Sequence, residues 1–172
     1  GYHGVWVGGA SGGAGVVLER CEVSGNEYSG VYIDSGEGVE ISECEVGGNG
    51  WYGVYGNTDA VGTRIENTIV EGNSESRTAA SGVYLRGPNS VVAGGSVRGN
   101  AGVGITIAHT ATGSEVSGVA VADNGGNGID VGSSDTVVSG NTVTAASELG
   151  GGQGLQRGIY ASGAAVIEGN TV

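Results

Sequence analysis

Residues 25–33 read Gly-Asn-Glu-Tyr-Ser-Gly-Val-Tyr-Ile, a Gly-Asn turn that leads into a short alternating segment. The turn recurs every 23 to 27 residues, with Asp-Asn in the fifth copy, and its asparagines are Asn26, Asn49, Asn73, Asn100 and Asn124. A glycine and a short apolar triplet follow each turn and also precede the first one, at residues 4–7, 30–33, 53–56, 82–85, 104–107, 128–131 and 158–161. A unit this short buries its apolar face only by stacking on its neighbours, so the repeat predicts a solenoid.

Two further apolar columns run through the same repeats. One column lies before the turns and contains Leu18, Ile41, Ile65, Val92, Val116, Val138 and Ile167. The other contains Val23, Val46, Val70, Val97, Val121, Val143 and Val172. Each repeat therefore holds three short β segments between Gly-, Asn-, Ser- and Asp-rich turns, with no helical period. Propeller blades need about 40 residues, so the period favours a parallel β-helix.

With these columns, the chain resembles the right-handed parallel β-helix proteins of the pectate-lyase-like superfamily over essentially its whole length. The expected fold is an all-β, right-handed, single-stranded parallel β-helix of about seven rungs, as one domain over residues 1–172. The resemblance implies a carbohydrate-active or surface protein, and it places Asn141 and Asn170 where the family often stacks an internal asparagine ladder. Because the sequence starts and stops within rungs, we expect flanking rungs or caps, or end-to-end self-association.

Composition excludes several other classes of protein. Gly supplies 39 of 172 residues and Pro only 1, which rules out collagen, and the regularly spaced valines argue against a disordered linker. The net charge of −12 argues against nucleic-acid partners and anionic membrane surfaces. No apolar run approaches the roughly 18 residues of a membrane helix, so membrane insertion is not expected. The acidic, lysine-free composition suits either a high-salt or an ordinary secreted protein, and we expect an extracellular or cell-surface location.

One outward column of the first strand is rich in aromatic residues. It reads Trp6, Tyr32, Tyr55, Tyr84, Thr106, Asp130 and Tyr160, and the other aromatics, Tyr2, Tyr28, Trp51 and Tyr52, precede the same strand. This aromatic stripe suits a polysaccharide that stacks its sugar rings along the rod; the alternatives are a cross-strand stack that stabilises the sheet and a protein-docking face. The predicted substrate-binding residues are Trp6, Tyr32, Tyr55, Tyr84, Thr106, Tyr160, Arg77 and Arg157, the two arginines belonging to turn insertions. The seven glycines that begin these strands are expected to leave a bare strip of backbone beside the stripe.

A candidate catalytic group lies in the middle of the rod. Tyr84, Arg86, His109 and Asp130 fall on neighbouring rungs, where Arg86 would neutralise a uronate carboxylate and His109 or Tyr84 would transfer protons. This favours a lyase or epimerase acting on acidic glycans, against the alternatives of scattered surface residues and a non-catalytic structural or adhesive module. The Asp-Pro-His run of alginate epimerases is absent from the sequence, and a lysine base is impossible.

The remaining expectations concern pairs on adjacent rungs. Asp34 and Asp59 could hold a hydrated Ca²⁺, and no other cofactor is expected. Cys21 and Cys44 share one column about 4.8 Å apart, which allows either a disulfide or stacked buried thiols. Glu40 and Arg64 share an outward column and form a possible ion pair.

Overall fold

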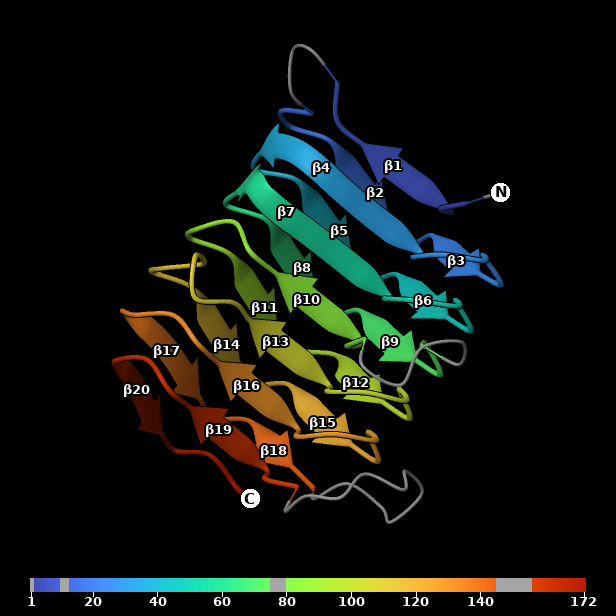
Figure 1. Ribbon diagram of the computed structural model, residues 1–172. Helices are drawn as coiled ribbons and strands as arrows, with labels where there is room; N and C mark the ends of the chain where they lie inside the picture. The colour runs from blue at the N-terminus through green and yellow to red at the C-terminus, as the bar shows by residue number, and fades with distance from the viewer. Residues whose placement is uncertain (1, 10–12, 75–79, 145–155) are drawn as a thin grey trace.

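The computed structural model describes residues 2–9, 13–74, 80–144 and 156–172, which form a stack of three parallel sheets (Figure 1). The first sheet contains β1 (Val5–Val7), β4 (Val31–Glu37), β7 (Val54–Val61), β10 (Val83–Leu85), β13 (Ile105–Ile107), β16 (Ile129–Val131) and β19 (Ile159–Ala161). The second contains β2 (Val17–Glu19), β5 (Glu40–Ser42), β8 (Arg64–Glu66), β11 (Val91–Ala93), β14 (Glu115–Ser117), β17 (Thr136–Ser139) and β20 (Ala165–Glu168). The third contains β3 (Glu22–Ser24), β6 (Glu45–Gly47), β9 (Ile69–Glu71), β12 (Ser96–Arg98), β15 (Ala120–Ala122) and β18 (Thr142–Val143).

The predicted all-β solenoid with three strands per rung is confirmed. Strands three apart in sequence pair in parallel, so the chain moves from the first sheet to the second and third and then returns one rung further along. After β20, an isolated bridge between Thr142 and Thr171 extends the third sheet. No helix in the described ranges is long and apolar enough to span a membrane.

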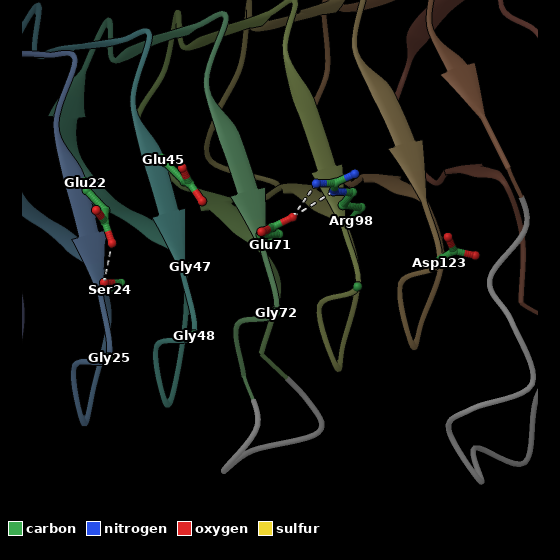
Figure 2. Close-up of a pocket in the computed structure, with 11 residues that line it drawn as sticks. Glu22, Ser24, Gly25, Glu45, Gly47, Gly48, Glu71, Gly72, Arg98 and Asp123 are labelled. Atoms are coloured by element: carbon green, nitrogen blue, oxygen red, sulfur yellow. Dashed lines mark hydrogen bonds and ion pairs between the residues drawn. The ribbon is translucent and has the colours of Figure 1, made fainter.

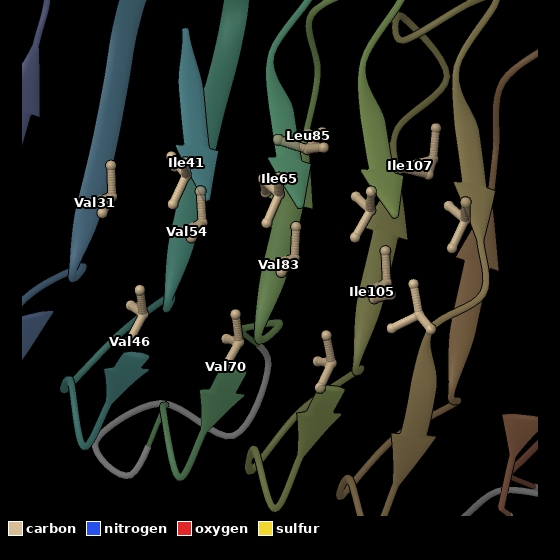
Figure 3. Close-up of a cluster of buried hydrophobic side chains, with 14 of the residues drawn as sticks. Val31, Ile41, Val46, Val54, Ile65, Val70, Val83, Leu85, Ile105 and Ile107 are labelled. Atoms are coloured by element: carbon tan, nitrogen blue, oxygen red, sulfur yellow. The ribbon is translucent and has the colours of Figure 1, made fainter. Parts of the chain in front are cut away.

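The core consists of the predicted apolar columns, drawn in part in Figure 3. Strand pairing aligns Val31, Val54 and Val83 in the first sheet, and all three are completely buried. Each fully buried side chain of this kind contributes about 1.5–3 kcal/mol of hydrophobic stabilisation. The columns end at the last rung, where Ile167 and Val172 are 46% and 73% exposed.

The asparagines of the Gly-Asn turns, which in the sequence serve only as repeat markers, form an internal ladder. The Asn49 amide donates to Asn73 Oδ1 at 2.9 Å, and the Asn73 amide donates to Asn100 Oδ1 at 3.0 Å. The same pattern joins Asn26 to Asn49 and Asn100 to Asn124. The ladder implied for Asn141 and Asn170 is also present, with a hydrogen bond of 2.8 Å. Asparagine suits a stack because its amide both donates to the next rung and accepts from the previous one.

The glycine column beside the ladder faces inward, so the expected bare strip of backbone beside the aromatic stripe is wrong. A Cβ built on Gly30 would lie 2.7 Å from Asn49 Nδ2 and 2.7 Å from Val46 Cγ1. Gly53 and Gly82 meet the next ladder asparagines in the same way. These positions need glycine because the ladder and the valine column fill the space that a side chain would occupy.

Two of the predicted pairs differ from expectation. Cys21 and Cys44 are both free, and only Cys44 is buried, which excludes a pair of buried thiols; the Cys21 backbone N–H instead points to Cys44 Sγ at 3.4 Å. Arg64 lies beside Glu40 in register but forms its ion pair with Glu66 on its own strand. The shared outward face of β8 explains this choice, because residues two apart on a strand lie on the same side.

Thiol labelling is expected to separate the two cysteines. Burial raises the pKa of the Cys44 thiol, so at neutral pH this thiol forms little reactive thiolate and reagents also lack access to it. An aromatic disulfide reagent should therefore titrate one thiol of the folded protein, Cys21, and a second only after denaturation. The Cys21→Ser variant should lose the fast reaction. Two fast thiols, or none before reduction, would contradict this assignment.

Candidate functional site

The aromatic stripe forms one outer column of the first sheet, as predicted. Strand pairing aligns Trp6 with Tyr32, Tyr32 with Tyr55, and Tyr55 with Tyr84. The column then continues through Thr106, Asp130 and Tyr160. Their neighbours on either side point into the core, which turns the stripe toward solvent.

Three tyrosines of the stripe stack on one another. The ring centroids of Tyr32 and Tyr55 are 5.1 Å apart with an interplanar angle of 3°, and those of Tyr55 and Tyr84 are 5.6 Å apart at 5°. Parallel rings at this separation cover part of each other's faces. The stack therefore stabilises the sheet and presents ring edges and hydroxyls outward, rather than three open faces.

The turn aromatics extend this stack into a larger cluster. The ring centroid of Trp51 lies 6.5 Å from that of Tyr55, and the Tyr52 ring packs beside both Tyr55 and Tyr84, at centroid distances of 5.0 Å and 5.4 Å. At the N-terminal end, the ring of His3 packs 4.6 Å from Tyr32, and burial lowers the pKa of His3, which favours its neutral form.

The most exposed rings of the stripe lie outside the tyrosine stack. Trp6 is 55% exposed and has no ring partner among the described residues. Tyr160 is 39% exposed, and the Arg157 guanidinium lies 4.8 Å from its ring centroid. The surface therefore has exposed rings toward both ends of the rod and a row of tyrosine hydroxyls between them.

A polar chain accompanies the tyrosine stack. Arg86 donates to Tyr55 Oη at 3.3 Å and to Asn57 Oδ1 at 3.2 Å, and the Asn57 amide donates to Asp34 Oδ1 at 3.4 Å. The hydrogen bond from Arg86 to Tyr55 raises the pKa of the guanidinium, and burial together with Asp34 raises the pKa of Tyr32. Arg86 is thus charged and held toward the N-terminal part of the stripe.

The candidate catalytic residues divide between two neighbourhoods. Arg86 engages Tyr55 and Asn57, whereas Asp130 accepts a hydrogen bond of 2.7 Å from Asn127. His109 is exposed in the turn after β13. In the described ranges, no hydrogen bond or ion pair joins Arg86 to His109 or Asp130. Catalysis by Tyr84, Arg86, His109 and Asp130 stays a prediction.

A shallow hollow of about 170 Å³ opens beyond the tyrosine stack. It is lined by Thr106, Ile107, Ala108, Asp130, Val131, Gly132, Tyr160 and Ser162. Ala108 and Gly132 occupy the column of Arg86, and this space stays open because alanine has only a methyl group and glycine has no side chain. Thr106 shares a 2.7 Å hydrogen bond with Ser81. Burial raises the pKa of Asp130, although the Asn127 hydrogen bond and the charge of Arg157 oppose this shift.

The two predicted Ca²⁺ ligands, Asp34 and Asp59, differ in their surroundings. Asp34 is bonded to Asn57, and Asp59 is exposed on β7 beside Ser35. The part of the chain that the structure describes contains no group of three or more His, Cys, Asp or Glu side chains arranged for a metal ion. Arg77 and most of both turn insertions lie outside the described residues.

A second, larger hollow of about 580 Å³ lies on the outside of the third sheet (Figure 2). Its acidic residues are Glu22, Glu45, Glu71 and Asp123, and its base contains glycines such as Gly47 and Gly72. Arg98 forms an ion pair of 2.6 Å with Glu71. This hollow was not predicted from the sequence; its signal there is a glutamate in each of β3, β6 and β9, with Gly25, Gly48 and Gly72 in the turns that follow. None of the described residues that line it is aromatic, which distinguishes it from the first sheet.

Comparison with known proteins identifies the family. A family model described as a right-handed β-helix region matches residues 3–172. The chain belongs to this right-handed β-helix family. No curated protein sequence matches this β-helix closely enough to be called a relative.

Two solved structures resemble this β-helix. A tailspike protein mutant of E. coli bacteriophage HK620, in complex with a pentasaccharide, has a TM-score of 0.65 and 13% identity over 89% of this chain and 32% of its own. The pectate lyase Pel9A has a TM-score of 0.59 and 12% identity over 94% of this chain and 56% of its own. The β-helix thus spans about a third and just over half of these two proteins. At such identities the likeness shows the fold alone.

Proposed function

We propose that this β-helix binds a polysaccharide along the outer face of its first sheet. The observation that carries the proposal is the aromatic surface itself: Trp6 and Tyr160 expose ring area, and tyrosine hydroxyls with Arg86 and Asn57 line the path between them. Aromatic faces pack on the apolar faces of sugar rings, and hydroxyl, amide and guanidinium groups bond sugar hydroxyls. Two β-helices of similar fold are named for a bound pentasaccharide and for pectate cleavage, which supports this proposal.

The geometry favours a binding module over an enzyme, because Arg86 and Asp130 belong to separate hydrogen-bonded groups. An extracellular or cell-surface location, where polysaccharides are met, belongs to the same proposal. A lyase acting on uronates would release an unsaturated product that absorbs ultraviolet light, and this assay tests the candidate catalytic residues directly.

The proposal is tested by glycan-array binding of the wild type and of a Trp6→Ala/Tyr55→Ala double variant. Removing one exposed ring and the centre of the hydroxyl row should weaken binding about tenfold or more, equivalent to roughly 1.4 kcal/mol. Ile69→Ala removes exposed apolar surface from the third sheet and serves as the control, with unchanged binding expected. The absence of any bound glycan on the wild type, or equal binding by the double variant with an intact fold, would refute the proposal.

A second candidate function is a structural module in which the aromatic residues stabilise the sheet. The nearly parallel stack of Tyr32, Tyr55 and Tyr84 favours this alternative, because such pairs contribute roughly 0.5–1.5 kcal/mol each. The same double variant separates the two functions. A lower melting temperature with no glycan bound by the wild type would support the structural module.

A further inference from the structure

The 170 Å³ hollow between Thr106 and Tyr160 has features that the rest of the stripe lacks. The stripe is filled by stacked rings up to Tyr84, whereas here small residues leave a depression over β13, β16 and β19. Tyr160 forms part of its wall, and the half-buried Asp130 lies between Thr106 and Tyr160 in the same column. The depression is therefore a place where a single ligand unit sits below the level of the tyrosine row.

Asp130 retains hydrogen-bonding capacity toward this space. Its Oδ1 accepts from the Asn127 amide at 2.7 Å, and within the described ranges no donor reaches its Oδ2. A carboxylate accepts up to about four hydrogen bonds, so sugar hydroxyls are suitable donors for it. Charge-assisted bonds of this kind are about twice as strong as neutral ones.

The charges around the hollow leave no net positive site for an anion. Arg157 lies over the Tyr160 ring beside the hollow, and its charge acts to lower the pKa of Asp130, so these two neighbouring groups carry opposite charges. Arg86 is bonded to Tyr55 and Asn57 and directed toward the N-terminal part of the stripe. A carboxylated ligand would place a second negative charge beside the Asp130 carboxylate, and the single charge of Arg157 offsets only one of the two.

We propose that this hollow is a subsite for a neutral, hydroxyl-rich sugar unit, and that Asp130 sets its preference against uronates. This inference rests on the proposed glycan binding and names its ligand class. The sugar donates hydroxyl hydrogens to Asp130 and packs against Tyr160. Specificity then comes both from these contacts and from repulsion of the wrong ligand.

The test uses one array carrying neutral glycans and several uronate oligosaccharides, each as the free acid and as the neutral methyl ester. The wild type should bind the esters about tenfold more tightly than the matched free acids. Asp130→Asn removes the charge and keeps the shape, so it should reduce this preference to within about threefold by strengthening binding of the free acids. Tyr160→Ala should weaken binding of neutral ligands about fivefold or more.

Two matched variants control for effects outside the hollow. Asp123→Asn makes the same charge change at an exposed turn beside the third sheet and should leave the preference unchanged. Tyr2→Ala removes a ring that is 70% exposed and lies away from the hollow, and it should leave binding at the hollow intact. A wild-type preference for the free acids, or an unchanged preference in Asp130→Asn, would overturn the inference while the proposed glycan binding stands. If the wild type binds no glycan, the proposed function itself fails.

Discussion

Replacing Asn73 with alanine is expected to destabilise the protein by about 3–5 kcal/mol. The Asn73 side chain is completely buried, donates to Asn100 Oδ1 and to the Val46 carbonyl, and accepts from the backbone and side chain of Asn49. Alanine would leave several of these groups without a partner in the interior, at roughly 1–3 kcal/mol each. Urea denaturation of the wild type and the variant measures the loss.

Asn73→Asp tests the donated hydrogen bonds separately, because it keeps the side-chain shape and replaces the donating amide group with a second acceptor oxygen. It should destabilise at least as much as alanine, since its oxygen would face the Val46 carbonyl and Asn100 Oδ1. Asn26→Ala, at the partly exposed start of the ladder, should cost only about 1 kcal/mol. If Asn26→Ala and Asn73→Ala cost the same, the interior ladder contributes nothing special to stability.

Gly53→Ala is the second substitution with a large expected effect, a loss of about 2–3 kcal/mol. The added Cβ would lie 2.5 Å from Val70 Cγ1, 2.8 Å from the Gly82 carbonyl oxygen and 2.9 Å from Asn73 Nδ2. Two of these three atoms belong to the backbone or to the ladder, so the contact is relieved only by moving a neighbouring rung. The melting temperature and the urea midpoint should both fall.

Gly47→Ala provides the control for the loss of glycine itself. Its added Cβ would lie 3.1 Å from the Glu71 carbonyl oxygen and 3.6 Å from Glu71 Cγ, a milder crowding than at Gly53, so the loss should stay below about 1 kcal/mol. A Gly53→Ala variant as stable as the wild type would show that the glycine column is not required for packing, and would restore the interpretation of an open backbone strip.

Most of the fold could be predicted from the sequence because the repeat is nearly exact in register. Aligning the repeats on the glycine that begins each first strand correctly predicted that Tyr32, Tyr55 and Tyr84 are neighbours across rungs, since in-register parallel pairing brings equivalent residues together. The alternation of side chains also placed these tyrosines outside and Val31 inside.

The candidate site was predictable only as a set of positions. Arg86 was expected to converge with His109 and Asp130, yet its long side chain turns back to Tyr55 and Asn57 on the preceding rung. Such a choice depends on rotamers and on the hydrogen-bond acceptors within reach, and a sequence column does not contain this information. The ion pair of Arg64 with Glu66 rather than Glu40 has the same cause.

The sequence by itself determined the architecture: three strands per repeat, which residues stack on which, and which faces are apolar. These features follow from backbone pairing and burial, and both appear in the sequence as the spacing of apolar residues. Only the tertiary structure decided which partners the side chains bond to and pack against. It showed that the Gly-Asn markers form a buried ladder, that the glycine column makes room for it, and that the tyrosines cover one another's faces. Each of these depends on side-chain direction and on space left by neighbouring rungs, which exist only once the rungs are stacked.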